Sequence, residues 1–301
     1  MKSGQYNDLA EADYRAASEI AKSDLDLVRR DPALYEWRKN TPKFEDKDSP
    51  VKFGRLFHKF LLQPEVFERD HVAELDTRDM VDTIEDIKAI LDSRGISYKK
   101  TARKPELMDI LNLSAPEIRI KSMAEAEHNA LYGDRIVTRA DMQRLEGMRA
   151  SVLAHPLMRD LLQGGQAEVS FFLQDMFKCR CDYLRENIIV DIKTTGNITD
   201  VERSIVKYRY HVQAGFYKHI VEQVTGEAHE FVFCFVGKSI DKEVYPVQVF
   251  TLPSEVEEIG YREAIEDYNV LCAFEQTPAI ATLTSVKKFF KELRVESEIF
   301  Y

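Results

Sequence analysis

The sequence has no long hydrophobic run, and this absence limits where the protein can act. No apolar stretch in its 301 residues approaches the roughly 18 to 20 residues that a membrane-spanning helix needs. The segment Met1–Tyr6 opens no apolar run of the kind found in a secretory signal. We therefore expect a cytoplasmic protein with no membrane partner.

Cysteine is scarce, and its spacing excludes several kinds of site. The chain has four cysteines, of which Cys179 and Cys181 are one residue apart on a predicted strand. That is not the CxxC spacing of a zinc or redox site, and Cys234 and Cys272 stand alone in apolar stretches. Buried free thiols are the simplest interpretation, and no cysteine-ligated iron–sulfur cluster is expected. A phosphate-binding loop motif is also missing, so an ATPase motor is not indicated.

Positive charge is not in excess either. The formal net charge is −10, which argues mildly against a protein that coats nucleic acid indiscriminately. A local basic channel remains compatible with this value, and a site with several metal-binding carboxylates would itself add negative charge. Composition alone is therefore neutral with respect to DNA.

The spacing of apolar residues predicts helices first and a sheet later. Helical spacing is typical of residues 1–70 and 138–162, and three strands follow at 167–173, 177–184 and 188–194. Further elements are expected in the order helix, strand, strand, helix, at 200–224, 230–236, 243–252 and 254–274. This order predicts a mixed α/β fold with a central mixed sheet flanked by helices.

Residues 79–116 read as a separate small unit of the type helix, extension, helix. A helix over 83–93 ends at Gly95, where a left-handed residue is favoured, and a second helix covers 104–113. So short a segment has too little core to form a domain by itself in most settings. We expect an N-terminal helical part at 1–78, an insertion at 79–116 and a core at 117–301.

The candidate site lies on the three successive strands. Alternation along Ile188–Thr195 places Asp191 and Lys193 on one face of a strand. Asp182 lies on the preceding strand and Glu168 at the start of the strand before it. A short hairpin would bring the two aspartates together. Clustered carboxylates repel one another, and a hard divalent cation such as Mg²⁺ or Mn²⁺ resolves that repulsion.

The same residues allow less specific interpretations. A D-x-K triplet is common, and an exposed edge strand with a surface ion pair would explain it equally well. His58, alone on an apolar helix, would more often be a core histidine. The combination of Asp182 and Glu168 with the triplet favours chemistry: a bound metal, with Lys193 orienting water or stabilising developing charge.

The spacing Glu168-x13-Asp182-x8-Asp191-Ile-Lys193 resembles the core of the PD-(D/E)XK nucleases. The sequence within and beyond these strands resembles one branch of that superfamily, the nuclease domain of RecE (exonuclease VIII) and its prophage relatives. This second resemblance covers most of the chain and rests on the runs DPALYEWRKN (31–40), FGRLFH (53–58), CRCD (179–182), DIKTT (191–195) and YRYHVQ (208–213).

The resemblance implies roles for particular residues. His58, Asp182 and Asp191 match metal ligands, with the Ile192 carbonyl as a further ligand. Lys193 matches the catalytic lysine, and Glu168 a glutamate near a second metal or a water. Several further residues are expected to bind DNA or support the site. They are the Q-x3-Y pair Gln213 and Tyr217, for which helix packing is the alternative, and the basic residues Arg55, Lys59, Lys207 and Arg209.

The chain departs from the family pattern in two places. Cys181 stands where the superfamily has its proline, and residues 79–116 are additional. The additional segment resembles a HeH/LEM-like helix–extension–helix module. Its basic residues would contact DNA phosphates or simply face solvent; they are Lys99, Lys100, Arg103 and Lys104.

The RecE resemblance implies a Mg²⁺-dependent, ATP-independent exonuclease that acts 5′→3′ on double-stranded DNA ends and leaves 3′ single-stranded tails. It also implies a RecT-like single-strand annealing partner and a ring-shaped homo-oligomer, a tetramer or trimer. Two other hypotheses remain: a catalytically inactive DNA-binding or assembly module with the nuclease fold, and an endonuclease of the same superfamily. The lack of a four-cysteine cluster disfavours a Cas4-like enzyme.

Overall fold

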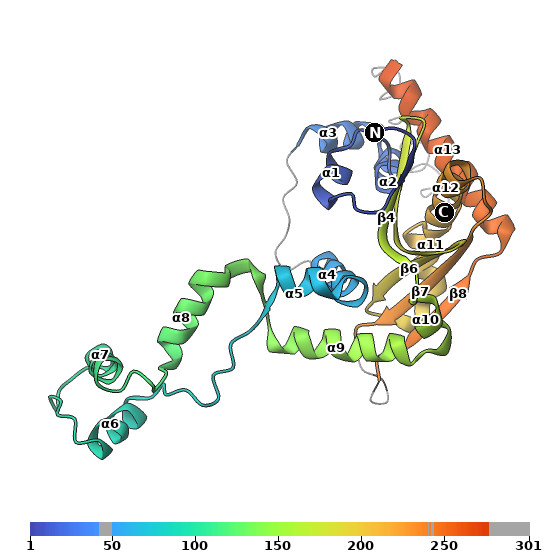
Figure 1. Ribbon diagram of the computed structural model, residues 1–301. Helices are drawn as coiled ribbons and strands as arrows, with labels where there is room; N and C mark the ends of the chain where they lie inside the picture. Colours follow the sequence, from blue (N-terminus) through green and yellow to red (C-terminus); the bar gives the residue numbers. More distant parts are fainter. Residues whose placement is uncertain (42–49, 240, 242–243, 277–301) are drawn as a thin grey trace, which may run out of the picture. The chain divides into compact units, whose positions relative to one another are not determined.

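A six-stranded mixed sheet forms the centre of the fold within the part of the chain that the structure describes (Figure 1). The computed structural model describes residues 1–41, 50–239, 241 and 244–276. The sheet has the strand order β1-β4-β5-β6-β7-β8, with bounds Gly4–Tyr6, Gln166–Leu173, Phe177–Arg185, Ile188–Thr195, Glu230–Gly237 and Val247–Thr251. Strands β6 and β7 are parallel and the other neighbours antiparallel, which confirms the expected mixed sheet.

Helices cover this sheet through one large apolar core. Strands β4, β5, β6 and β7 share that core with helices α2 (Lys22–Arg30), α3 (Pro32–Asn40), α12 (Tyr210–Thr225) and α13 (Ser254–Gln276). Alternating apolar residues explain the sheet side of the core: Phe231, Phe233 and Phe235 are all buried on one face of β7. The remaining helices near the sheet are α1 (Glu11–Ala16), α4 (Pro50–Leu62), α10 (Pro156–Leu161) and α11 (Val201–Lys207).

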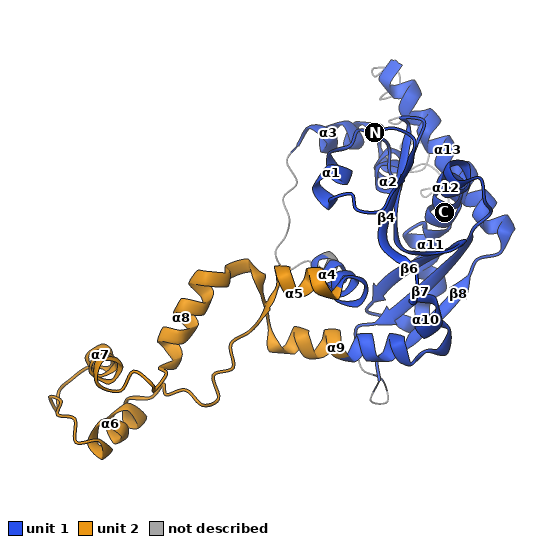
Figure 2. Ribbon diagram, in the orientation of Figure 1, with its two compact units in different colours: residues 1–63, 147–301 blue, residues 64–146 orange. Residues whose placement is uncertain are grey.

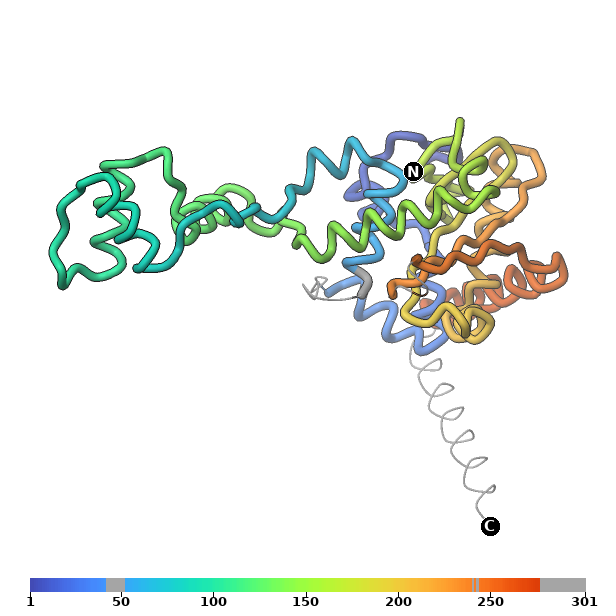
Figure 3. Tube along the Cα trace, turned by 90° about the horizontal axis from the view of Figure 1, so that it is seen from below, coloured from blue at the N-terminus to red at the C-terminus, as the bar shows by residue number. Residues whose placement is uncertain are grey.

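Helices α12 and α13 lie side by side, because two glycines let their backbones approach closely (Figure 1, Figure 3). A Cβ atom at Gly215 would lie 2.0 Å from the Glu257 carbonyl oxygen, and one at Gly260 would lie 2.0 Å from that of His211. Neither position accepts a larger residue without a shift of backbone. This contact fixes where α12 lies against the sheet.

The structure divides into two compact units, and the boundary differs from the expected one (Figure 2). Unit 1 comprises residues 1–63 and 147–301, and unit 2 comprises residues 64–146. Unit 2 thus extends the expected insertion on both sides. Two contacts explain the extension: a short parallel pairing of β2 (Val72–Ala73) with β3 (Ile136–Val137), and hydrogen bonds from the Arg135 side chain to the carbonyl oxygens of Arg69 and Asp70.

Unit 2 contains the expected pair of helices around its own small core. Its elements are α5 (Pro64–Asp70), α6 (Ile84–Ser93), α7 (Lys104–Ser114), α8 (Lys121–Tyr132) and the first part of α9 (Arg139–Ala154). The core residues include Ile87, Leu91, Leu107 and Leu111, all fully buried. Helix α6 ends at Gly95 with a φ of 66°, and the Ile96 N–H donates to the Leu91 carbonyl at 2.9 Å. The predicted helix end is confirmed.

Several expected elements are corrected by the structure. The helix expected over 138–162 is two helices, because Pro156 begins α10 and cannot continue the hydrogen bonding of α9. The helix expected over 200–224 is also two, α11 and α12, separated at Arg209 with a left-handed φ of 52°. The last strand is shorter than 243–252, and residues 242–243 lie outside the described residues. The N-terminal strand β1 was not expected at all.

None of the helices in the described part of the chain combines the length and the apolar character that a membrane span requires.

Candidate active site

The site begins where strands β5 and β6 stop pairing. Their ladder runs from Arg185↔Ile188 to Tyr183↔Val190, and the next residues in register are Asp182 and Asp191. There the Ile192 N–H donates to the Asp182 carboxylate at 2.7 Å instead of to a backbone carbonyl. A side chain thus replaces the backbone acceptor, and the two aspartates lie where the strands part.

Three side chains from three different elements meet beside this point. His58 comes from α4, Glu168 from β4 and Asp182 from β5, and one ligand atom of each lies within 4.8 Å of the other two. The His58 Nδ1 and Asp182 Oδ1 atoms are 3.5 Å apart. Helix α4 approaches the sheet closely at Gly54, because a Cβ atom there would lie 3.3 Å from the Thr194 hydroxyl. Helix α4 therefore packs closely against β6 at Gly54.

Glu168 holds an unusual backbone conformation for a residue in a strand. It has a φ of 56°, in the left-handed region that side chains other than glycine rarely adopt. By register it stands opposite Asp182, between the pairs Ala167↔Tyr183 and Val169↔Cys181. Such strain persists where surrounding structure imposes it, and it is frequent at functional sites. Here it brings the Glu168 carboxylate toward the carboxylate of Asp182.

The carboxylate charges of this cluster are only partly offset by the neighbouring side chains, which include Arg180, whose Nη1 lies 3.9 Å from Glu168 Oε2. Burial, together with the charge of Asp182, raises the pKa of Glu168 to about 7. Burial would also raise the pKa of Asp182, but His58, Lys193 and the Ile192 N–H lower it below its usual range. Asp182 is therefore ionised at neutral pH, and a second carboxylate beside it is disfavoured unless a cation is present.

Two carboxylates and one imidazole form a donor set that fits a divalent cation. Carboxylate oxygens suit Mg²⁺ and Mn²⁺, and the added imidazole nitrogen is compatible with Mn²⁺ in particular. The raised pKa of Glu168 supports the fit, since a bound cation would remove the repulsion that causes it. His58, Glu168 and Asp182 are the residues that would hold the ion.

Asp191 and Lys193 form the second part of the site. The Lys193 Nζ atom is 2.6 Å from Asp191 Oδ2, and the Gln213 amide donates to Asp191 Oδ1 at 2.6 Å. Burial raises the pKa of Asp191 to about 6, while Lys193 opposes that rise. Burial would lower the pKa of Lys193, but Asp191 and Asp182 raise it, so the ammonium group is charged.

The structure therefore groups the predicted residues differently from the expected ligand set. Glu168 joins His58 and Asp182, whereas both oxygens of Asp191 are engaged by Lys193 and Gln213. The backbone group of Ile192 that reaches Asp182 is its N–H. The role of the Ile192 carbonyl as a ligand stays a prediction.

Helix α12 carries the residues that hold Asp191 and Lys193. Gln213 is buried and reaches Asp191, as described, whereas the ring of Tyr217 packs against Phe231 in the core at 6.2 Å. Of the Q-x3-Y pair, Gln213 thus contacts the site and Tyr217 packs in the core. At the start of the helix, the ring of Tyr210 lies 5.0 Å from Lys193 Nζ, in the geometry of a cation–π contact.

The expected basic residues have different surroundings. Arg55 and Lys207 are exposed, and Lys59 is half-buried on α4. Arg209 is half-buried among three carboxylates, with nitrogen–oxygen distances of 3.2 Å to Asp26, 3.2 Å to Glu263 and 2.6 Å to Asp267. The Arg209 guanidinium is thus engaged by carboxylates of the chain itself, and its expected role in binding DNA or supporting the site stays a prediction.

Sequence reasoning missed two residues near Lys193. Lys22, in the first turn of α2, is buried, and burial lowers its pKa together with the charges of Lys193 and Arg209. Its Nζ atom lies 5.9 Å from the ring centroid of Tyr210. Lys22 is 171 positions before Lys193 in the chain, and no local pattern marks it. Tyr210 lies inside the run YRYHVQ (208–213), which carries part of the family resemblance. That run was the one feature of the sequence that could have indicated Tyr210.

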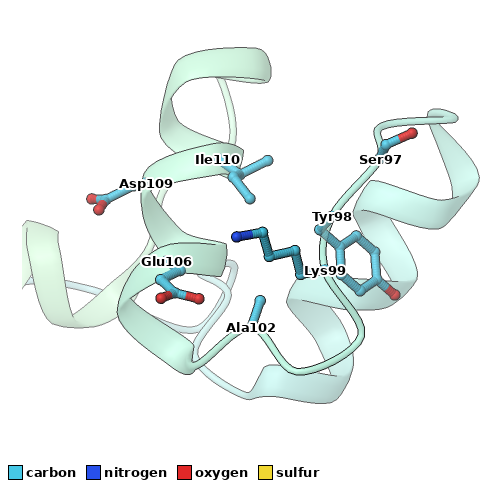
Figure 4. A pocket seen from close by; sticks show the side chains of 7 residues that line it. All are labelled: Ser97, Tyr98, Lys99, Ala102, Glu106, Asp109 and Ile110. Atoms are coloured by element: carbon cyan, nitrogen blue, oxygen red, sulfur yellow. The ribbon is translucent and has the colours of Figure 1, made fainter.

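A hollow of about 550 Å³ lies in unit 2, whereas the catalytic candidates belong to unit 1 (Figure 4). It is lined by Tyr98, Lys99, Glu106, Asp109 and Ile110, together with Ser97 and Ala102. Lys99 thus shares the hollow with two carboxylates. Of the other basic residues expected to contact DNA, Lys104 pairs with Asp82 at 3.0 Å. A DNA contact by this module stays a prediction.

Comparison with known proteins agrees with this geometry. A family profile described as a PDDEXK-like domain of unknown function (DUF3799) matches residues 33–284. No curated protein matches the chain. A crystal structure of a protein named "Putative exonuclease", from Eubacterium rectale, is similar with a TM-score of 0.53 and 14% sequence identity, over 88% of this chain and 85% of that one. At this identity the similarity concerns the fold alone. The family profile and the mixed sheet flanked by helices together confirm the expected PD-(D/E)XK, restriction-endonuclease-like core.

Proposed function

The chain belongs to the family of PDDEXK-like domains, and on this premise we propose that it is a metal-dependent nuclease that degrades DNA from its ends. One observation carries the proposal: His58, Glu168 and Asp182 bring the donor atoms of a divalent-cation site together, and this cluster adjoins a charged lysine, Lys193. A binding module without catalysis would have no need of this combination, which is costly to bury.

The chain's own residues have distinct tasks in the proposed reaction. A divalent cation held by the cluster would supply positive charge to the scissile phosphate and favour ionisation of water. Lys193 stabilises the negative charge that develops on the phosphate, or orients the attacking water. Asp191 and Gln213 keep Lys193 in place, and the burial of the whole group strengthens these electrostatic effects.

The finer description rests on the sequence resemblance to RecE-type exonucleases. It comprises Mg²⁺ dependence without ATP, action 5′→3′ on double-stranded ends, 3′ single-stranded tails, a RecT-like annealing partner and a ring-shaped homo-oligomer. The similar fold of a protein named as an exonuclease supports the exonuclease part. An endonuclease of the same superfamily is the second candidate, because the same carboxylate–lysine arrangement can cut internal bonds.

The test compares DNA with and without ends. The purified protein is incubated with Mg²⁺ and a linear duplex labelled at either 5′ or 3′ ends, beside a covalently closed circle, with EDTA and Lys193→Ala as controls. We expect early release of mononucleotides from 5′ ends, an intact circle, no release in EDTA, and strongly reduced release by Lys193→Ala. Cutting of the circle would favour the endonuclease. Retained DNA binding without degradation would favour the inactive module.

A further inference from the structure

An aromatic side chain is exposed at the junction between α11 and α12. Tyr208 follows the last residue of α11, and 49% of its surface is accessible. Val206, two residues earlier, is 72% exposed. A large aromatic ring at the surface, close to a site that handles nucleic acid, calls for a physical explanation.

The backbone at this junction is held in place from two directions. Arg209 adopts the left-handed region with a φ of 52°, a strained conformation for a residue other than glycine. Its guanidinium group is fixed by the three carboxylates of Asp26, Glu263 and Asp267, the last of which is almost fully buried. The Tyr208 carbonyl also accepts a hydrogen bond from the buried Lys22 ammonium group at 2.7 Å. These contacts impose the conformation that leaves Tyr208 exposed.

A short chain of contacts connects Tyr208 to the proposed catalytic lysine. The ring centroids of Tyr208 and Tyr210 are 5.6 Å apart, with an angle of 35° between the rings. The Tyr210 ring in turn lies 5.0 Å from Lys193 Nζ. The ammonium group of Lys207, the last residue of α11, lies 5.2 Å from the centroid of the Tyr208 ring. The exposed ring thus lies one aromatic ring away from Lys193 and beside a cation.

We propose that Tyr208 forms a nucleobase-stacking subsite, which binds the base of a nucleotide next to the phosphate held at Lys193. This inference rests on the proposed nuclease function and deepens it. An aromatic face stacks on any base, and a nearby cation attracts the backbone, so such a subsite binds a strand without regard to its sequence. The strained, ion-paired junction between α11 and α12 would then keep the Tyr208 ring fixed beside the reacting phosphate.

The test uses DNA that lacks single bases. Binding is measured by fluorescence anisotropy with the Asp182→Ala protein, which keeps Lys193 and is expected not to cut, and short duplexes that each carry one abasic nucleotide at a different position near the end of one strand. We expect one position at which loss of the base weakens binding by about 5- to 150-fold. Tyr208→Ala in the same background should weaken binding to intact DNA by a similar factor and show no added loss at that abasic position.

Matched variants separate stacking from a general loss of structure. Tyr208→Phe keeps an aromatic face and should bind intact DNA as the parent does, whereas Tyr208→Leu, of similar apolar character, should behave as Tyr208→Ala. Trp37→Ala removes another exposed aromatic residue, on α3. This variant should keep the full abasic penalty, which is the loss of affinity caused by the abasic nucleotide at the sensitive position. Thermal unfolding of each variant confirms that it is folded.

Two outcomes would overturn the inference. One is an unchanged abasic penalty in Tyr208→Ala at every position, and the other is the absence of any such penalty in the parent protein. Degradation of linear DNA by the wild-type protein is assayed in parallel. If the wild type cuts but the abasic penalty does not depend on Tyr208, the stacking inference fails and the nuclease proposal stands. If the wild type does not cut, the nuclease proposal itself fails.

Discussion

The two halves of the site differ in how their charges are balanced. In the cation half, formed by His58, Glu168 and Asp182, two carboxylates share one imidazole and the Arg180 guanidinium, 3.9 Å from Glu168. Burial with the charge of Asp182 still raises the pKa of Glu168 to about 7. In the lysine half, Asp191 already has Lys193 and Gln213 as partners, each at 2.6 Å. Repulsion that favours a bound cation remains in the first half, whereas in the second half Asp191 forms an ion pair with Lys193 and accepts a hydrogen bond from Gln213.

This difference teaches how such a site can fold without its metal. A buried charge is tolerated when it is paired and hydrogen-bonded, and the lysine half meets this condition. The cation half instead keeps Glu168 near its neutral form until a cation binds. Mutations should therefore separate the halves: changes in the first should affect ion binding, and changes in the second should affect the reaction alone.

The largest expected effect separates the two halves directly. Lys193→Ala should lower the rate of DNA cutting by about 10²- to 10³-fold, the range for loss of one charge-stabilising group. Mn²⁺ binding, measured by isothermal titration calorimetry, should change little, because Lys193 is not a ligand. Asp182→Ala should lose both cutting and ion binding. Asp191→Ala should also abolish cutting, because it removes the partner of Lys193.

A second lysine–carboxylate pair, which connects α12 to α13, provides the control. Lys218 lies 2.7 Å from Glu257, and neither residue belongs to the site. Lys218→Ala should keep wild-type cutting, which would show that the loss of a partly buried lysine–carboxylate pair does not by itself lower activity. Near-wild-type cutting by Lys193→Ala would contradict the assignment of the lysine half.

A smaller effect is expected from the support of the lysine half. Gln213→Leu removes the hydrogen bond to Asp191 while it keeps the side chain's volume. We expect cutting to fall by about 10- to 100-fold, as is usual for residues that orient a group at a metal site. The measurement is kcat and KM on a linear duplex, and the change should fall mainly on kcat.

The other half of the Q-x3-Y pair supplies a contrast. Tyr217→Phe keeps the ring that packs against Phe231, so it should cut at nearly the wild-type rate. An equal loss of activity in both variants would mean that Tyr217 acts in the site as well. It would then contradict the division between site and core.

Much of this site was predictable, because its strands follow one another in the chain. The alternation of Ile188–Thr195 and one short hairpin were enough to bring Asp182 beside Asp191 and Lys193. The three central strands and the mixed sheet followed from the same periodicity. Local patterns of this kind are readable, since residues two apart on a strand share a face.

Contacts between distant segments were not predictable. Nothing near Lys22 indicates that it will lie beside the ring of Tyr210, because that contact depends on how α2 packs against α12. The left-handed Arg209 interrupts a continuous helical pattern, and its three carboxylate partners come from α2 and α13. Tertiary packing overrode local propensity at this position.

The smallest expected effect concerns the cation half and stability. Glu168 has a pKa of about 7 in the folded protein and an ordinary value of 4.5. Below pH 4.5 it is protonated in both the folded and the unfolded protein, and above pH 7 it is charged in both. The folded protein therefore loses stability as the pH rises between these values. Glu168→Gln should raise the free energy of unfolding at pH 8 by on the order of 1 kcal/mol, because partial exposure screens the charge.

Asp182 should show the opposite sign in the same experiment, which is urea unfolding in EDTA at pH 5 and pH 8. Its pKa is lowered in the folded protein, so its charge contributes stability above its ordinary pKa of 3.8 and this contribution is lost at lower pH. Asp182→Asn should thus be less stable than the wild type at pH 8, where Glu168→Gln is more stable. Added Mn²⁺ should stabilise the wild type and reverse the advantage of Glu168→Gln, because only a full set of carboxylates binds the ion tightly. If Glu168→Gln is no more stable than the wild type in EDTA at pH 8, the cation half is not held under repulsion, and the contrast between the two halves is lost.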